Sequence, residues 1–321
     1  MATGTLATEQ SIITQFIFED FTDVNEVQGL LFTLLIIIYI FTLSGNLLII
    51  SLICTHPNLH VPLYIFVAIL SFVEIWYTGI TIPKMLTNLL NEKMISFIGC
   101  ILQIYFFHCM GITETYLLTV MAYDRYMAIC NPLRYPYIMT NVCCFQLAAS
   151  CWILGLFGPL AQIILLSRLS FCGSNKIEHI FCDFNPLIKL ACSDTSLNVT
   201  VDFAINSFLL LLAFTCIITS YIKIISAVLK IKTTEGRKKA FSTCGAHLTV
   251  VVLFFGSVSF IYVRLTNFKS VNYDRAMAVI YSVLTPMCNP IIYSLRNREI
   301  REILKKWFGE LFLNAKVDIQ G

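Results

Sequence analysis

Two carboxylates, Glu74 and Glu114, are unusual because each stands inside a long apolar stretch. A charged side chain inside a membrane is costly, so such residues usually face the interior of a helix bundle and find a partner there. Two neighbouring carboxylates do not easily both ionise. The pair can therefore share a proton or a cation, or it can consist of two protonated, hydrogen-bonded structural acids. The residues alone leave both interpretations open.

A second polar group, Asp124-Arg125-Tyr126, ends the apolar stretch that contains Glu114. An Arg at the edge of a bilayer needs a partner, and Asp124 is adjacent to it. Such a pair can act as a switch. The alternative is an Arg that snorkels to the interface and only anchors the helix end. Glu114 precedes Arg125 by eleven residues, which in a helix corresponds to about 16 Å.

Enzymatic and metal chemistry find no support in the pattern of residues. No nucleophile, base and orienting group stand at workable spacing. His108 and Cys109 are adjacent, and adjacent helical side chains point apart, so they do not form a metal site. A net charge of +3 is too small to indicate nucleic acid. We expect no catalytic residue, no metal, no cofactor and no nucleic-acid partner.

The elements that must hold the polar groups are apolar helices. The chain has 321 residues, of which 57% are hydrophobic and 13% charged, against about 25% charged in a soluble domain. A bilayer is crossed by about 20 apolar residues. Seven segments are long enough: 29–54, 61–90, 98–123, 142–166, 199–229, 240–263 and 274–295. Because backbone in lipid must satisfy its own hydrogen bonds, the predicted fold is an all-α, seven-transmembrane helix bundle.

Basic residues predict the orientation, because Lys and Arg concentrate on the cytoplasmic side. Residues 1–28 contain none, which also argues against a cleaved signal peptide. The connection 230–239 and the stretch 296–306 are basic. We expect 1–28 to be an extracellular tail, 29–295 the transmembrane domain and 296–321 a cytoplasmic tail, in the plasma membrane. The alternative is a channel with six or eight spans.

The C-terminal stretch 297–313 predicts a short amphipathic eighth helix. Its apolar stripe at helical spacing consists of Ile300, Ile303, Leu304, Trp307, Phe308 and Leu311. A basic amphipathic helix beside a membrane exit usually lies in the interface. The alternative is a frayed, solvated tail.

Four of the thirteen cysteines fall on the expected outer side: Cys100, Cys172, Cys182 and Cys192. An even number in an oxidising compartment predicts two disulfides, and four cysteines allow three pairings that the sequence does not separate. A zinc site would prefer short C-x-x-C pairs. Asn198 begins an N-x-T glycosylation sequon on the same side. Its closeness to the fifth apolar segment is expected to hinder modification.

Five motifs, in order along the chain, resemble those of the olfactory receptor family of rhodopsin-like G-protein-coupled receptors. They are LHVPLY at 59–64, PKML at 83–86, MAYDRYMAIC at 121–130, KAFSTCGAHL at 239–248 and PMCNPIIY at 286–293. The resemblance extends from about Gly29 to Gly309. Two departures stand out: Phe255 replaces the Tyr of a Phe-Tyr-Gly pattern, and the N-terminal tail lacks the usual sequon.

The resemblance implies roles for the polar groups. In such receptors a carboxylate holds the Arg when inactive and frees it to meet the G protein. The implied switch residues are Asp124, Arg125, Tyr126, Tyr221, Asn289, Pro290 and Tyr293. Pro290 removes a backbone hydrogen bond and should kink the seventh helix. With Asn289, the region of Glu74 and Glu114 can hold a sodium ion or a proton, and we hypothesise that its loss is coupled to activation.

A ligand is expected in the outer half of the bundle, where the third helix passes through the middle. The candidate ligand-binding residues on the third, fifth and sixth helices are Phe107, His108, Gly111, Ile112, Asp202, Ile205, Asn206, Leu209, Phe255, Val258, Ser259 and Tyr262. A mostly apolar cavity with a few polar handles favours a small, volatile molecule over a peptide or an amine. Phe107 stands where aminergic receptors carry an acid.

The resemblance therefore implies an odorant receptor that activates a stimulatory, olfactory-type G protein and raises cyclic AMP. A receptor for a small metabolite or lipid, with the same transduction, is one alternative, and expression outside nasal tissue would favour it. An ion channel or transporter that uses Glu74 and Glu114 as an ion path is another. Ligand-dependent current without a G protein would favour that class.

Overall fold

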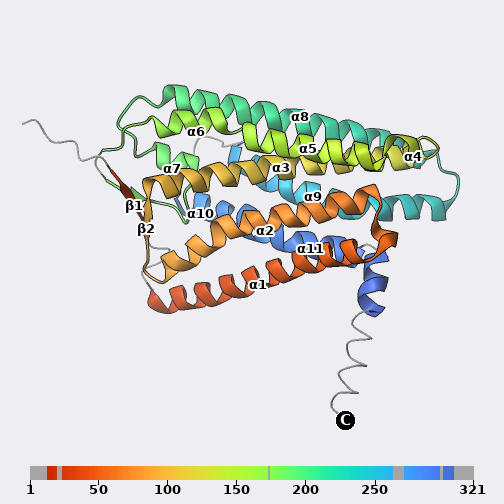
Figure 1. Cartoon of the computed structure of the whole chain (residues 1–321), viewed down its shortest axis with the longest axis horizontal. Helices are drawn as coiled ribbons and strands as arrows, with labels where there is room; N and C mark the ends of the chain where they lie inside the picture. The colour runs from red at the N-terminus through yellow and green to blue at the C-terminus, as the bar shows by residue number, and fades with distance from the viewer. Residues whose placement is uncertain (1–12, 20–23, 173, 263–270, 297–298, 307–321) are drawn as a thin grey trace, which may run out of the picture.

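The bundle consists of long apolar helices. The structure, a computed structural model, describes residues 13–19, 24–172, 174–262, 271–296 and 299–306. In these residues six helices are long and apolar enough to cross a membrane, and a shorter apolar helix runs over Cys244–Ser257. Consecutive long helices run in opposite directions and lie side by side (Figure 1). The predicted helical membrane bundle is confirmed.

The first three long helices are α1 (Asn25–Thr55), α2 (Pro62–Leu89) and α3 (Phe97–Cys130). Proline suits the first turn of α2, because the N–H that it lacks would have no helical partner there. The hydroxyl of Ser96 accepts a hydrogen bond from the Gly99 N–H and caps α3. Helix α3 packs against α2, α5, α6, α8 and α9, so it forms the centre of the bundle. It extends beyond the predicted end at residue 123, and Asp124 and Arg125 are therefore still helical.

The fourth apolar segment, expected as one helix, is divided into α5 (Asn141–Phe157) and α6 (Leu160–Ser167). The break lies at Gly158 and Pro159, where the proline has no N–H to continue the helical ladder. Helix α5 lies very close to α3. A Cβ atom at Gly155 would stand 2.7 Å from the carbonyl oxygen of Cys109, so only glycine permits this approach.

Two further long helices, α8 (Ser196–Leu229) and α9 (Thr234–Tyr262), follow in the chain. The seventh apolar segment comprises α10 (Val271–Val279), a π-helical turn at Ile280–Leu284 and α11 (Thr285–Arg296).

The irregular turn of this segment therefore comes before the proline at which we predicted a kink, and Pro290 lies inside α11. Pro290 cannot donate to the carbonyl of Pro286 four residues earlier. The side-chain amide of Asn46 approaches that carbonyl at 3.5 Å, so α1 supplies the donor that the proline lacks.

A small sheet, which the all-α prediction missed, closes one end of the bundle (Figure 1). Strand β1 (Gln15–Phe18) pairs antiparallel with β2 (Met94–Ser96) and parallel with β3 (Lys176–Ile177). Phe16 and Phe18 are buried in an apolar cluster of their own, which includes Cys100 and Cys182. The short helix α7 (Phe184–Ile188) belongs to the same cluster. We call this region the sheet end.

The other end of the bundle carries the short helix α4 (Tyr135–Ile138) and a helical stretch at 299–306 (Figure 1). We call it the opposite end. Ile300 is buried, and Ile303 and Leu304 pack against the main core. The predicted amphipathic helix is thus present over 299–306. Trp307, Phe308 and Leu311 lie outside the described residues, as do residues 1–12 of the predicted tail.

Candidate functional site

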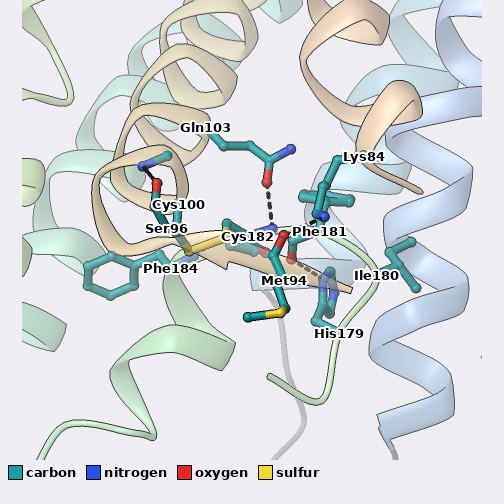
Figure 2. Close-up of a disulfide and its surroundings, with 12 residues drawn as sticks. Lys84, Met94, Ser96, Cys100, Gln103, His179, Ile180, Phe181, Cys182 and Phe184 are labelled. Atoms are coloured by element: carbon teal, nitrogen blue, oxygen red, sulfur yellow. Dashed lines mark hydrogen bonds between the residues drawn. A yellow bond between two sulfur atoms is a disulfide. The ribbon is translucent and has the colours of Figure 1, made fainter. Parts of the chain in front are cut away.

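Two disulfides fasten the sheet end. Of the three possible pairings, the structure has Cys100–Cys182 and Cys172–Cys192. Figure 2 shows the first bond, together with Gln103 one turn further along α3. The Gln103 side chain accepts a hydrogen bond from the Cys182 N–H at 2.9 Å and donates to the carbonyl of Ile80 at 2.7 Å. The segment around Cys182 is therefore fixed over the end of α3.

Lys84, the lysine of the PKML motif, has a structural role that sequence reasoning did not assign. Its amino group donates to the carbonyls of Glu92 and Met94, both at 2.9 Å. It also lies 5.6 Å from the centre of the Phe18 ring (Figure 2 shows Lys84 and Met94). One side chain thus ties α2 to the turn before α3 and to the N-terminal strand.

A cavity lies beneath the Cys182 segment, between α2, α3, α7, α8, α9 and the π-helical turn. The centre of a water-sized sphere can occupy about 110 Å³ of it, whereas a single water needs only about 10–15 Å³. The cavity therefore has room for a small molecule. Its wall consists of Tyr77, Phe107, His108, Gly111, Ile112, Thr115, Tyr116, Asp183, Phe184, Asn185, Asp202, Asn206, Leu209, Leu210, Phe254 and Tyr281.

The structure brings together seven of the candidate ligand-binding residues in this wall: Phe107, His108, Gly111, Ile112, Asp202, Asn206 and Leu209. Ile205 and Phe255 are not part of it. The Phe255 ring is buried and packs 5.8 Å from the ring of Phe214, while its neighbour Phe254 lines the cavity. One residue turns a helix by about 100°, so an error of one position moves a side chain off the wall. The side chains of Val258, Ser259 and Tyr262 lie outside the described part of the structure.

Sequence reasoning missed the wall residues at the start of α7, namely its cap Asp183 and the helical residues Phe184 and Asn185. They follow Cys182 directly, so a known Cys100–Cys182 pairing would have placed them over α3. It also missed Tyr77 on α2 and Tyr281 in the π-helical turn, whose ring centres lie 4.8 Å and 5.7 Å from that of Phe107.

Polar contacts fix several wall residues. The Nδ1 atom of His108 bonds the carbonyl of Ile104 at 2.8 Å, so Nδ1 carries the hydrogen. One oxygen of Asp202 accepts from the Asn206 amide at 3.0 Å. One oxygen of Asp183 accepts from the Phe184 N–H at 2.8 Å and caps α7. The wall therefore combines aromatic rings with two held carboxylates.

The acid pair lies deeper in the bundle, one turn from the cavity wall. Glu74, Glu114 and Asn289 are each at most 2% exposed. The Asn289 amide donates to Glu74, and the two carboxyl groups interact directly. One oxygen of each of the three side chains is buried with no hydrogen-bond partner among the described residues. Buried oxygens without donors suit a shared proton or a small cation.

At the opposite end Asp124 and Arg125 form a buried ion pair through Nε and Nη2 of the Arg. The Tyr135 hydroxyl donates to the other Asp124 oxygen at 2.8 Å. Burial, and then the Asp124 charge, raise the pKa of Tyr135, so its hydroxyl stays protonated and remains a donor. The Tyr126 ring lies 5.2 Å from the Lys223 amino group. The predicted carboxylate partner of Arg125 is thus in place.

His247 joins three helices, a role that its place in the KAFSTCGAHL motif did not indicate. Its Nε2 bonds the carbonyl of Leu118 at 3.0 Å and its Nδ1 bonds the Tyr221 hydroxyl at 2.6 Å. A carbonyl only accepts, so Nε2 carries the hydrogen and Nδ1 accepts from Tyr221. This one ring links α3, α8 and α9. Nearby, Tyr293 is buried, and its hydroxyl has no partner among the described residues.

Pro290 packs against α1, where a Cβ atom at Gly45 would stand 3.2 Å from the proline ring. Asn198, the sequon asparagine, lies in the first turn of α8 and is only 5% exposed. This burial is unfavourable for a glycan, in line with the expected hindrance.

Known proteins are similar to this chain in sequence and in fold. A family model for olfactory receptors matches residues 35–311. Human olfactory receptor 6N1 is 55% identical over 297 residues, covering 92% of this chain and 95% of that protein. Human olfactory receptor 6K2 is 48% identical, covering 94% of each chain. Mouse olfactory receptor 6B9 is 45% identical, covering 92% of this chain and 93% of its own.

Among solved structures, squid rhodopsin superimposes with a TM-score of 0.67, covering 92% of this chain and 84% of its own. At 17% identity this likeness shows the fold alone. The relatives are receptors, which excludes an enzyme by family. The chain belongs to the olfactory receptor family and is an odorant-sensing membrane receptor with the seven-transmembrane fold of the G-protein-coupled receptors.

Proposed function

We propose that the receptor binds a small, mostly apolar odorant in the cavity beneath Cys182 and activates a stimulatory, olfactory-type G protein, which raises cyclic AMP. The observation that carries the proposal is the position of both sites on α3. Its first half contributes Phe107 and Gly111 to the cavity, and its last turns contribute the buried Asp124–Arg125 pair. Movement of one rigid helix can thus connect the two sites.

The orientation follows the basic residues. We propose that the sheet end faces the outside and the opposite end the cytoplasm of a cell, with the receptor in the plasma membrane. Lys230, Lys232 and Arg237 lie at the junction of α8 and α9, and Arg301 and Lys305 lie on the last helical stretch. Cytoplasmic loops are enriched in such residues, and disulfides form in the oxidising exterior.

A ligand shifts this receptor only by its difference in affinity for two conformations. In the active one, Arg125 leaves Asp124 and meets the G protein, and the inner end of α9 moves away from α3. The Tyr221–His247–Leu118 bonds join those helices, so they must rearrange in this step. Tyr126, Asn289, Pro290 and Tyr293 complete the proposed switch.

A cyclic-AMP reporter assay with a panel of small volatiles tests the proposal. Wild type should respond to at least one compound, and Arg125→Ala at equal surface level should not. Lys189→Met, which changes an exposed residue outside the cavity wall and outside the Asp124–Arg125 pair, is the matched control. An equal response in Arg125→Ala, or ligand-dependent current without any G protein, would contradict the receptor mechanism.

We also propose that Glu74 and Glu114, with Asn289, share a sodium ion or a proton whose loss accompanies activation. The support is the set of buried oxygens without donors described above. Glu114→Gln supplies a permanent amide donor and removes one acid. Its activation curve should lose most of the wild-type dependence on sodium or on pH. A dependence identical to that of wild type rules the coupling out.

A further inference from the structure

Two carboxylates from distant parts of the chain meet in the cavity wall. Asp183 follows the disulfide-bonded Cys182 and caps α7, and Asp202 lies on α8. The two acids are close enough to interact electrostatically. Both are partly buried, so each charge is less well solvated than it would be on an open surface.

Within the described part of the chain, each carboxylate accepts a hydrogen bond through one of its oxygens. Asp183 accepts from the Phe184 N–H, and Asp202 accepts from Asn206. For the second oxygen of each acid, the described part of the chain offers no hydrogen-bond donor. Both acids therefore retain an acceptor, and each borders the cavity.

Among the described residues, the wall does not balance the charge of its two acids. His108 is the one basic side chain among the described wall residues, and it interacts with Asp202. Even a protonated His108 would neutralise only one of the two acids. A partly desolvated carboxylate without a counter-ion is costly, so a cation from the ligand would be stabilised here.

Aromatic rings form a large part of the remaining wall. They belong to Tyr77, Phe107, Tyr116, Phe184, Phe254 and Tyr281. Such rings bury the apolar body of a ligand and attract a cation to their faces. Acids and rings together favour an ammonium group on a small apolar body.

We propose that the ligand of this cavity is a small aliphatic or aromatic amine, held in its protonated form by Asp202 and Asp183. This inference rests on the proposed function and specifies its ligand class. It revises the preference against amines that followed from Phe107, because the acids come from α8 and the Cys182 segment rather than from α3.

The test compares matched ligands. Each of several volatile skeletons, for example hexyl and 2-phenylethyl, is presented as its amine, its alcohol and its carboxylic acid. Two readouts are used: the cyclic-AMP response of cells, and the thermal stability of the purified receptor with each compound. The amine should act at a concentration roughly ten- to a hundredfold lower than the alcohol, the gain expected from a hydrogen bond to a charged group.

The variants Asp202→Asn and Asp183→Asn should each bring the amine toward the alcohol of the same skeleton. Asparagine retains an oxygen, so the bonds to Asn206 or to Phe184 have a reason to persist. Glu178→Gln, an exposed acid of the same loop outside the cavity, is the matched control and should leave the ranking unchanged.

The outcomes separate the two proposals. If alcohols or acids act at the same or lower concentration than amines, the amine inference is wrong and the receptor function stands. If amines are preferred but both Asn variants keep that preference, the assignment to Asp183 and Asp202 is wrong. If no compound of any class stabilises or activates the receptor, cavity binding fails, and the inference fails with it.

Discussion

Different kinds of bond stabilise the two ends of this receptor. The sheet end has two disulfides, a three-stranded sheet and its own apolar cluster. At the opposite end the described residues have no disulfide. Helices there are joined by single polar contacts such as Tyr135–Asp124 and Tyr221–His247.

Because of this difference, we expect the sheet end to be rigid and the opposite end to be able to change its contacts. A hydrogen bond contributes about 0.5–1.5 kcal/mol net, so one contact can be exchanged for another when a ligand changes the conformational equilibrium. A disulfide cannot be exchanged on that timescale. The cover of the cavity is therefore fixed, and the end proposed to meet the G protein can rearrange. Removing these contacts one at a time shows which property depends on each of them.

The largest effect is expected from Cys182→Ser, which removes the bond between the cavity cover and α3. Loss of a native disulfide typically costs about 2–5 kcal/mol. Surface expression should fall severely, and the melting temperature of the solubilised receptor should drop. Cys54→Ser, which changes a free and exposed cysteine of α1, should leave both unchanged. Equal losses in the two variants would show that the disulfide is not the cause.

His247→Ala should weaken the opposite end. It leaves the Tyr221 hydroxyl and the Leu118 carbonyl without their partner, at a cost of about 1–3 kcal/mol. Because the ring joins α3 and α8 to α9, cyclic AMP without ligand should rise. Tyr221→Phe removes only one of the two bonds and should act less strongly.

Cyclic AMP without ligand should be only slightly higher in the double variant His247→Ala with Tyr221→Phe than in His247→Ala, because the two residues share one bond. Basal cyclic AMP equal to that of wild type in all three variants, at matched surface level, would argue that these bonds do not restrain activation.

Lys84→Met tests whether the contacts of the sheet end affect stability without affecting signalling. Methionine keeps an apolar stem, while the bonds to the Glu92 and Met94 carbonyls and the contact with Phe18 are lost. The lysine is half-buried and its contacts are few, so the cost should be only about 1 kcal/mol. Thermal stability should decrease and basal cyclic AMP should stay at the wild-type level. A rise in basal signalling would show that this end also restrains the switch.

The smallest effect is expected from Tyr135→Phe, which removes one neutral donor from Asp124 and costs about 0.5–1 kcal/mol. Its pH dependence has a definite sign. Burial and Asp124 raise the pKa of Tyr135, so the folded state keeps a proton that the unfolded chain loses near pH 10, roughly the ordinary tyrosine value.

The stability difference between wild type and Tyr135→Phe should therefore be constant from about pH 6 to about pH 9 and shrink only as the pH rises above about 10. Melting curves across this range measure it. A difference that already disappears near neutral pH would mean that the Tyr135–Asp124 bond is not its source.

The fold could be predicted from the sequence, because bilayer thickness and backbone hydrogen bonding are local constraints. Each span had to be a helix of known minimum length. A related constraint explains why Glu74 and Glu114 face the interior of the bundle, because a carboxylate that faces lipid is energetically costly. The short strands escaped prediction because pairing between residues 15–18, 94–96 and 176–177 joins segments far apart in the chain.

The candidate site could be predicted only in part, and the misses have physical reasons. On the regular helix α3, residues such as Phe107 and Gly111 follow from helical spacing alone. On α9, a one-residue error in rotation selected Phe255 instead of Phe254. Residue types alone did not single out His247 as a link between three helices, because its partners Leu118 and Tyr221 are far away in the chain.

The sequence by itself determined that this chain crosses a membrane through apolar helices and that it carries the motifs of its family. The composition of each span and the order of the motifs need no partner to be recognised. Only the tertiary structure decided that Cys100 pairs with Cys182, and hence that Asp183 stands in the same cavity as Asp202. Four cysteines allow three pairings, and composition does not distinguish between them. Which acids line the cavity therefore depends on the pairing that the folded chain adopts.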